Sequence, residues 1–455
     1  MPWWSVAIVV FGVNFVLWAS VGLARLIEEN WATKTLRGRL RRLGVRSGPS
    51  MTVQDVAVLI PAHNEELVIE ASIAAITALV PRCNVHVVSD GSTDRTAELA
   101  RQTGVNVIET RTNVGKAGAL EEAIERFGLV QRFRAVLLLD ADTTIEPGYF
   151  DAALPHFDDP QVVAVAGAVR THWHGRALSM VGKVLVCHRE RIYAISQRLL
   201  KFGQTWRFTN ATHIVPGFAS MYRTAVLPQI EMNPPGLVIE DFNMTFEIYQ
   251  KRLGKVAFSL GAVAVTQDPD NLRDYVRQIK RWGLGLWQTV RRHPPRLNLF
   301  SAMLTVLLLE LLTSSMFFLL LPLLVVVLAV PAVYPDALSW PGMVSLHGAV
   351  AAHMTLRVLL LAVTGADLAL TCVVALIERR FRFVLLWIFF PFLRVLDAAI
   401  ALYVFPRAWL SSTGRWTSPV RRAVGMRPAL TDQMTVSSAV TASSTDYTHS
   451  PTWTG

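Results

Sequence analysis

Charged residues are scarce in this chain of 455 residues, of which only 17% are charged and 52% are hydrophobic. The three cysteines, Cys83, Cys187 and Cys372, form no close pair, which argues against a disulfide framework or a cysteine-bound metal. The segment "TNVGKAGA" (112–119) lacks the spacing of a Walker A loop, so a P-loop nucleotide site is excluded. The mean hydropathy of +0.36 is too high for an ordinary soluble enzyme.

Long uncharged runs lie at the two ends of the sequence. The first, "WWSVAIVVFGVNFVLWASVGLA" (3–24), is long enough to span a bilayer. A signal peptide is the competing interpretation, but the run is too long and no basic segment precedes it. We therefore predict a retained transmembrane helix within residues 1–27. Basic residues between positions 25 and 46 place that side of the membrane in the cytoplasm by the positive-inside rule.

Apolar segments return near the C-terminal end, at 299–332, at about 343–377 and at 383–405. We predict a membrane region over 299–405 with about three spans, the last two separated by the basic stretch "ERRFR" (378–382). Three spans would leave the basic tail outside the cell, against the charge rule, so a re-entrant segment stays an alternative. Residues 406–455 are expected to form a polar and partly disordered tail.

Five charged side chains inside these apolar segments would be costly in lipid, so we expect them to face one another or a water-filled path. They are Glu310, Arg357, Asp367, Arg394 and Asp397. The net charge of +10 could indicate nucleic-acid binding, but most of the basic excess lies beside membrane segments and favours anionic lipid headgroups. The protein is predicted to be multi-pass in the plasma membrane, with residues 28–298 forming a cytoplasmic domain and with no nucleic-acid partner.

Strand-like and helix-like segments alternate in the first part of this domain. Buried-type strands are expected within "VAVLIPAHNEE" (56–66), "NVHVVSDGSTDRTAELA" (84–100), "VNVIET" (105–110) and "RAVLLLD" (134–140). Helical segments follow the strands, for example "GKAGALEEAIERF" (115–127). The alternation predicts an α/β fold with a doubly wound, mostly parallel, Rossmann-like sheet, flanked by transmembrane helices.

Acidic residues follow several of the predicted strands. In "LLLDADTTI" (137–145), Asp140 and Asp142 lie two positions apart and would point the same way. Two neighbouring carboxylates repel each other unless a cation lies between them, and Mg²⁺ or Mn²⁺ suits oxygen ligands beside a diphosphate. An acidic pair in a solvated loop is the alternative for this motif alone. Asp90 follows another strand, and ligands bind beyond the carboxyl ends of such strands, so all three acids should share one crevice.

Two later segments carry further candidates. Lys116, flanked by glycine at a helix start, could meet phosphate, although a solvated lysine beside a turn is equally consistent with the pattern. In "LVIEDFNMTFEIYQKRLG" (237–254), Glu240 and Asp241 open a predicted helix that stops at Gly254. A carboxylate in a first turn tends to stay ionised, which suits a general base, but plain N-capping is the favoured interpretation of this motif taken alone.

The segment "RDYVRQIKRWGLGLWQTV" (273–290) predicts a helix at the membrane surface, because aromatic and basic residues are mixed just before an apolar run. One helical stripe is apolar and consists of Tyr275, Ile279, Trp282, Leu286 and Val290. Gln278 lies one turn from Arg281 and Trp282. Trp287 is expected to be a simple interfacial anchor.

The ordered motifs "SDGSTD", "DAD", "GFASMYR" (217–223), "IED" and "QIKRW" resemble the membrane-embedded glycosyltransferases of family 2. This group contains cellulose, chitin, hyaluronan and poly-N-acetylglucosamine synthases. The resemblance covers about residues 53–292 and implies a GT-A-like fold. The Gln-x-x-Arg-Trp signature, shared in particular with cellulose and hyaluronan synthases, is typical of synthases that keep a growing chain.

The resemblance implies a role for each matched residue. Asp90 would contact the uracil or ribose, with Lys116 near the nucleotide. Asp140 would hold the nucleoside side, and Asp142 the Mg²⁺ or Mn²⁺ that bridges the diphosphate; the acid pair together is the predicted metal site. Asp241 would be the base that accepts a proton from the acceptor hydroxyl. The helix predicted over 273–290 carries the Gln-x-x-Arg-Trp signature and is called the signature helix below. Three of its residues would cradle the diphosphate and the acceptor sugar: Gln278, Arg281 and Trp282.

The sequence departs from the family pattern at two places. Ile239 stands where the family usually has threonine, which removes a hydroxyl beside the base. "VTQDPDN" (265–271) differs from the family's usual loop before the signature helix, and that loop helps to contact acceptors, so the acceptor stays open.

The function implied is an inverting glycosyltransferase that uses a UDP-sugar to elongate, and to translocate across the membrane, a β-linked polysaccharide. UDP-N-acetylglucosamine and UDP-glucose are the donors the family favours. Transfer of one sugar to a lipid acceptor is the alternative. A transporter or receptor whose cytoplasmic domain only senses nucleotide-sugars is a third hypothesis, although a sensor has no need for a positioned base.

Overall fold

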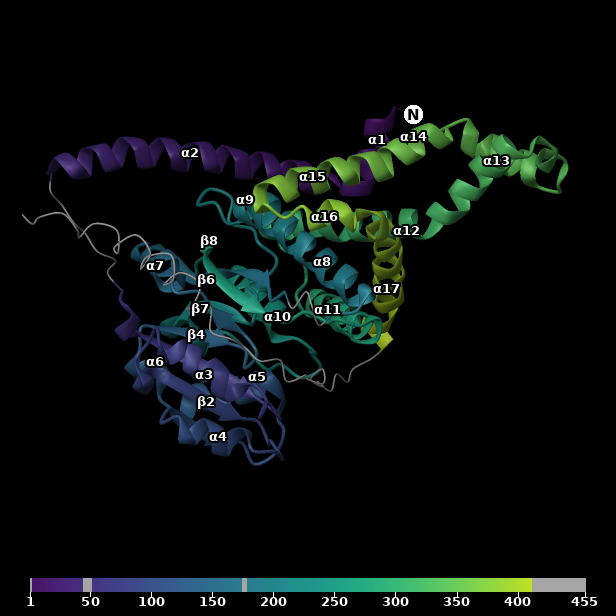
Figure 1. Cartoon of the computed structure of the whole chain (residues 1–455). Coiled ribbons are helices and arrows are strands. Elements are labelled where there is room, and N and C mark those ends of the chain that lie inside the picture. Colours follow the sequence, from purple (N-terminus) through teal and green to yellow (C-terminus); the bar gives the residue numbers. More distant parts are fainter. Residues whose placement is uncertain (1, 44–50, 174–177, 411–455) are drawn as a thin grey trace, which may run out of the picture. The chain divides into compact units, whose positions relative to one another are not determined.

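One mixed sheet of eight strands organises the part of the chain between the apolar ends. The computed structural model describes residues 2–43, 51–173 and 178–410 (Figure 1). The sheet order is β3-β2-β1-β4-β7-β6-β8-β5. The strands are β1 (Val56–Ala62), β2 (Val85–Ser89), β3 (Asn106–Glu109), β4 (Ala135–Leu139), β5 (Thr144–Ile145), β6 (Val162–Thr171), β7 (Ala219–Arg223) and β8 (Lys255–Thr266).

Strands β3, β2, β1 and β4 run parallel to one another, which confirms the fold predicted from the alternation of strands and helices. β6 and β8 form a further parallel pair, while β7 runs antiparallel to both β4 and β6. β5 is antiparallel to β8. The strands that follow residue 140, β5 to β8, are not among those predicted from the sequence.

The helices of this domain lie between the strands and after them. They are α3 (Ile69–Thr77), α4 (Thr96–Gln102), α5 (Gly115–Arg126), α6 (Leu129–Arg132), α7 (Tyr149–Ala153), α8 (Met180–Ile195), α9 (Phe202–Gln204), α10 (Glu240–Gln250) and α11 (Leu272–Arg292), with a π-helical segment η4 (Ser196–Lys201) that joins α8 to α9. The helices predicted over 115–127 and 273–290 are confirmed as α5 and α11. The helix predicted to run to Gly254 begins at Glu240 as expected but ends at Gln250.

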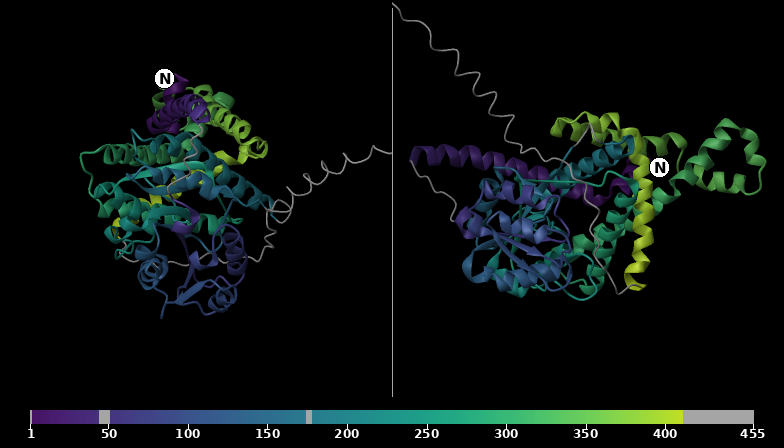
Figure 2. Two further views of the ribbon diagram at one scale, coloured as in Figure 1. Left: turned by 90° about the vertical axis from the view of Figure 1, so that its left-hand side faces the viewer. Right: turned by 60° about the horizontal axis from the view of Figure 1, so that its bottom comes forward.

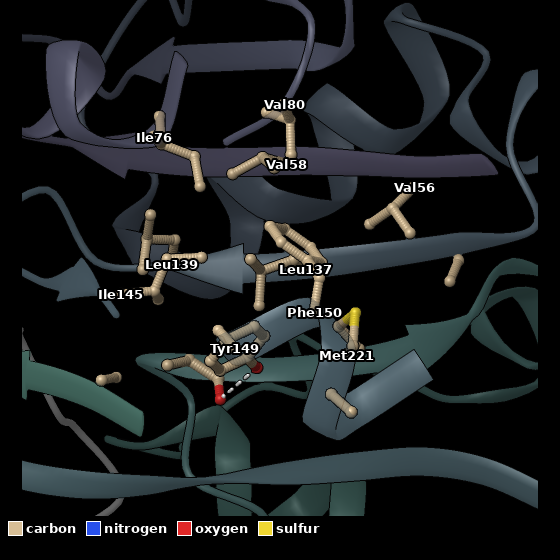
Figure 3. Close-up of a cluster of buried hydrophobic side chains, with 14 of the residues drawn as sticks. Val56, Val58, Ile76, Val80, Leu137, Leu139, Ile145, Tyr149, Phe150 and Met221 are labelled. Carbon is tan, nitrogen blue, oxygen red and sulfur yellow. Dashed lines mark hydrogen bonds between the residues drawn. The ribbon is translucent and has the colours of Figure 1, made fainter. Parts of the chain in front are cut away.

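Apolar side chains fill both faces of the sheet, because successive residues of a strand point to opposite sides. Leu137 and Leu139 of β4 lie with Ile76 of α3 in one buried cluster (Figure 3). Leu138, between them in sequence, lies with Leu120 of α5 in the cluster on the other face. Full burial of each such leucine stabilises the fold by roughly 1.5–3 kcal/mol. The uninterrupted apolar run of β4 therefore reflects a strand covered on both faces.

Among the described residues, three helical segments are long and apolar enough to cross a membrane: Leu299–Val333, Leu356–Glu378 and Trp387–Leu410. They comprise α12 (Leu299–Val333), α14 (Leu356–Leu360) continuing into α15 (Ala366–Glu378), and α17 (Phe390–Leu410). Two short helices, α13 (Met343–Ala351) and α16 (Arg382–Leu385), precede the second and third segments. α17 packs against α12 and α11 (Figure 2). It continues past the predicted tail start at 406, and residues 411–455 lie outside the described residues.

The N-terminal apolar run forms two helices rather than one. α1 (Trp3–Phe11) and α2 (Val13–Leu43) are separated at Gly12, which has a φ of +86°. A side chain at Gly12 would collide with the carboxylate of Glu310 from α12. The same carboxylate accepts a hydrogen bond from the N–H of Asn14 at 2.9 Å, so it caps the start of α2. The single N-terminal span stays a prediction.

Most of the charges within the apolar segments pair as expected for costly groups, whereas Arg357 on α14 is exposed. The guanidinium of Arg394 lies 3.1 Å from Asp367, and Arg191 of α8 approaches the same carboxylate at 3.1 Å. Asp397 accepts a hydrogen bond from the Tyr275 hydroxyl at 2.8 Å. Two carboxylates in these segments, Asp367 and the partly buried Asp397, therefore tie the apolar helices to α8 and α11.

Candidate active site

The carboxyl ends of β2, β1 and β4 meet at one edge of the sheet, because these neighbouring strands are parallel. Asp90 follows β2 and Asp140 follows β4. The carboxylate of Asp90 accepts hydrogen bonds from the N–H of Val114 at 2.8 Å and from the Thr110 hydroxyl at 3.0 Å. Asp90 therefore anchors the start of α5, the helix that carries Lys116.

Strand β7 brings a second segment to the same edge, since it runs antiparallel to β4 and so begins where β4 ends. The N–H of Asp140 donates to the carbonyl of Phe218 at 3.2 Å. Gly217 lies just before the strand, and a Cβ atom there would lie 3.0 Å from a carboxylate oxygen of Glu240 and 3.1 Å from Nζ of Lys116. Glycine at this position allows the charged groups to approach one another closely.

Lys116 lies at the centre of this arrangement. Its Nζ is 2.8 Å from Asp140 Oδ1 and 3.0 Å from Glu240 Oε1, and it donates to the carbonyl of Gly217 at 3.0 Å. An ammonium group has three hydrogens, so these three oxygens satisfy it completely. Burial lowers the pKa of Lys116, but the two carboxylates outweigh burial and raise it above its ordinary value. A phosphate contact, as predicted from the sequence, would require one of these partners to be exchanged.

Asp241 lies next to this lysine cluster at the start of α10. Its carboxylate accepts hydrogen bonds from the N–H of Phe242 at 2.8 Å and, at 3.4 Å, from the N–H of Gly217. Burial, followed by the negative charge of Glu240, raises the pKa of Asp241 to about 7. For Glu240, burial acts to raise the pKa, but Lys116 outweighs it, so the pKa is lowered. One carboxylate thus stays ionised while its neighbour can take up a proton near neutral pH, an arrangement suited to acid–base chemistry.

Asp140 and Asp142 are the candidate metal ligands. Asp142 is 4% exposed in the turn after β4, where it accepts a hydrogen bond from the Thr143 hydroxyl at 3.3 Å. No group of three or more His, Cys, Asp or Glu side chains able to hold a metal occurs within the described ranges. Two carboxylates fit Mg²⁺ or Mn²⁺, because such ions take their remaining ligands from substrate phosphates and water.

Helix α11 is attached to the start of α10. The side chain of Gln288 accepts a hydrogen bond from the N–H of Val238 at 3.1 Å, and Gly285 lets Ile239 pack directly on the helix. Trp282 belongs to the same apolar cluster as Ile239. Arg281 also helps to lower the pKa of Glu240, although its effect is smaller than that of Lys116. The structure therefore places the signature helix beside the carboxylate pair.

One expectation about α11 needs correction. Trp287 was predicted to be an interfacial anchor, but it is 4% exposed and packs edge-on against Phe405 at 4.7 Å between ring centroids. That interpretation of Trp287 is wrong, because α17 covers this side of α11.

Three residues that the sequence did not single out as site residues belong to the site. Glu240 is the second partner of Lys116, and the acid pair in "IED" was the available signal. Gly217 belongs to the segment "GFASMYR" (217–223), but its close approach to the charged groups depends on the tertiary structure. Arg189 of α8 contacts Gln278 and Trp282, and no local pattern marks it.

The chain matches the model of a protein family described as "Glycosyltransferase like family 2" over residues 54–285. It is 24% identical over 275 residues to the poly-beta-1,6-N-acetyl-D-glucosamine synthase of Staphylococcus aureus (strain COL). The aligned region covers 58% of this chain and 62% of the relative. It is 28% identical over 245 residues to the probable glycosyltransferase YdaM of Bacillus subtilis (strain 168), 50% of this chain and 54% of the relative. The chain thus spans less than two thirds of these curated relatives.

A solved structure shares the fold. The mannosyltransferase PcManGT from Pyrobaculum calidifontis, in complex with GDP-Man and Mn²⁺, superposes with a TM-score of 0.50 at 18% identity. The superposition covers 85% of this chain and 99% of that protein. The likeness extends beyond the sheet domain, because residues 54–285 make up only about half of this chain.

Proposed function

Because this chain belongs to glycosyltransferase-like family 2, we propose that it is an inverting glycosyltransferase that transfers a sugar from a UDP-sugar to a hydroxyl acceptor at the membrane. The observation that carries the proposal is the carboxylate pair of Glu240, which is buried, and Asp241, which is only partly exposed, beside Lys116 and Asp140. The synthase among the relatives makes UDP-N-acetylglucosamine the first donor to test, with UDP-glucose as the second.

In the proposed mechanism, Asp241 accepts the proton of the acceptor hydroxyl as that oxygen bonds to the anomeric carbon of the donor. The bond between the anomeric carbon and the diphosphate oxygen breaks, and UDP departs with the electron pair. Because the acceptor attacks the face opposite the diphosphate, an α-linked donor gives a β-linked product. A pKa of about 7 suits this step, since the base must be ionised at neutral pH and still bind a proton readily.

The neighbouring charges support this step in two ways. Lys116 keeps Glu240 ionised, and the charge of Glu240 helps to raise the pKa of Asp241. Arg281 on the signature helix would offset the negative charge that develops on the departing diphosphate. Asp140 and Asp142 would hold Mg²⁺ or Mn²⁺, which supplies further neutralisation of that charge when bound. The mannosyltransferase with the same fold was solved with Mn²⁺.

Elongation and translocation of a β-linked polysaccharide is the product we propose, supported by the apolar helices that follow the catalytic domain and by the synthase among the relatives. Transfer of one sugar to a lipid is the alternative. Purified protein incubated with UDP-N-acetylglucosamine separates the two. A polymer ladder on a gel supports elongation, whereas a single glycolipid by mass spectrometry supports the alternative.

The decisive test of the chemistry is UDP release by wild type and by Asp241→Asn. Loss of a general base lowers such a reaction by about 10²–10⁴-fold, and we expect a decrease in that range. Asp151→Asn, an exposed position on α7, is the matched control and should keep wild-type turnover. Unchanged turnover in Asp241→Asn would refute the base assignment. Wild type that releases no UDP with any donor would instead favour a nucleotide-sugar sensor.

A further inference from the structure

Arg189 of α8 is a buried charge that the catalytic proposal does not use. It is 2% exposed, and its guanidinium reaches two residues of the signature helix. Nη2 donates to the side-chain oxygen of Gln278 at 3.0 Å, and the guanidinium carbon lies 4.1 Å from the centroid of the Trp282 ring. A desolvated guanidinium over a tryptophan face is attractive, so this contact restricts the ring orientation.

A second set of contacts fixes Arg189 itself. The guanidinium Nε lies 3.5 Å from Asp268 Oδ1, and Nη2 donates to the Tyr193 hydroxyl at 2.7 Å. Asp268 also accepts hydrogen bonds from Tyr193 at 3.0 Å and from the hydroxyl of Thr171 at 2.6 Å. Its side chain is 1% exposed. Asp268 belongs to "VTQDPDN" (265–271), the segment that departs from the usual family loop.

The membrane helix α17 holds both helices that carry this contact. Asp397 accepts hydrogen bonds from the Tyr275 hydroxyl at 2.8 and 3.1 Å, and its Oδ2 lies 3.4 Å from Nε2 of His188. Tyr275 lies one turn before Gln278 on α11, and His188 immediately precedes Arg189 on α8. Tyr275 and His188 are both fully buried. The distance between α8 and α11 is thereby fixed where Arg189 bridges them.

We propose that Arg189, held by Asp268, is a positioning residue that orients Gln278 and Trp282 towards the acceptor sugar. The inference rests on the proposed function together with the family resemblance, by which Gln278 and Trp282 help to cradle the diphosphate and the acceptor sugar. Loss of Arg189 leaves the carboxylate pair and the nucleotide-facing acids in place. Loss of Arg189 therefore impairs sugar transfer to the acceptor more than it impairs hydrolysis of the donor.

The test compares donor hydrolysis with transfer in the full-length, detergent-solubilised protein. UDP-N-acetylglucosamine is supplied with and without a short β-1,6-linked N-acetylglucosamine oligomer, and released UDP and extended oligomer are both quantified. We expect Arg189→Met to lower the ratio of transfer to hydrolysis at least tenfold and to raise the KM for the oligomer more than the KM for the donor. Arg189→Lys, which keeps the charge but loses the planar fork, should recover part of the ratio.

Arg191→Met is the matched control for burial. Arg191 lies on the same helix, is also 2% exposed, and also pairs with a buried carboxylate, that of Asp367, but it points to α15. The Arg191→Met variant should keep the wild-type ratio of transfer to hydrolysis, even if the variant melts at a lower temperature than wild type. A parallel loss of both activities in Arg189→Met, or an unchanged ratio, would overturn the inference. Wild type that releases no UDP would refute the proposed function, and the inference with it.

Discussion

The raised pKa of Asp241 predicts how the rate depends on pH. An aspartate titrating at about 7 is ionised to roughly one tenth at pH 6, one half at pH 7 and nine tenths at pH 8. Because the base must be ionised, kcat/KM should rise about fivefold from pH 6 to pH 7 and less than twofold from pH 7 to pH 8. UDP release at low donor concentration, measured in half-unit steps of pH, gives the profile of the free enzyme.

Glu240→Gln tests the cause of this shift. Burial and the charge of Glu240 are the two largest causes that raise the pKa of Asp241, so removal of that charge should move the acid limb to lower pH. Lys116 also faces Asp241 and acts to lower its pKa. Burial lowers the pKa of Lys201 to about 8 although Asp241 opposes this, so the alkaline side carries a second titration. A wild-type profile that is flat between pH 6 and pH 7.5, or an unmoved limb in Glu240→Gln, would refute the reasoning.

The same shift has a consequence for stability with a defined sign. An aspartate whose folded pKa is raised from 3.8 to about 7 binds more protons when folded, so stability is lost as pH rises through that window. The loss at pH 8 is at most about 4 kcal/mol, and less because Asp241 is partly exposed. Asp241→Asn should therefore melt at a higher temperature than wild type at pH 8, with less than half of that difference at pH 5 and little difference at pH 3. A lower melting temperature at pH 8 would contradict this account.

Three further predictions concern the surrounding site. Gly217→Ala should lower activity and destabilise the protein by about 1–3 kcal/mol, because its Cβ would lie 3.0 Å from Glu240. Gly148→Ala, where a Cβ would meet open space, is the control and should change neither the melting temperature nor the rate of UDP release. Lys116→Met should lower the free energy of unfolding by about 3 kcal/mol, because it leaves two carboxylates unpaired. Adding Glu240→Gln should recover part of this loss, which a double-mutant cycle in thermal melting would measure. EDTA should abolish UDP release and Mn²⁺ or Mg²⁺ should restore it, with Asp142→Asn requiring a higher metal concentration. Activity that survives EDTA in wild type would contradict the metal assignment.

Local patterns in the sequence were sufficient to predict those strands and helices whose formation depends on residues near one another in the chain. The apolar run from 134 to 140 predicted β4 because a strand covered on both faces has no polar alternation. The acids at the ends of β2 and β4 could be predicted to meet, since parallel strands present their carboxyl ends at one edge of a sheet. The helix over 273–290 followed from its period.

Contacts between distant segments could not be read from such patterns. Lys116 could be read as a phosphate ligand, but Asp140 and Glu240 lie 24 and 124 positions away, and only the antiparallel return of β7 and the start of α10 bring them to its ammonium. Trp287 fitted an interfacial anchor until α17, more than a hundred residues later, was found to cover it. The sequence by itself thus determined which chemical groups are available and at which strand ends they lie. The tertiary structure decided which charges neighbour each other, and hence their pKa values, because that depends on distances across the sheet.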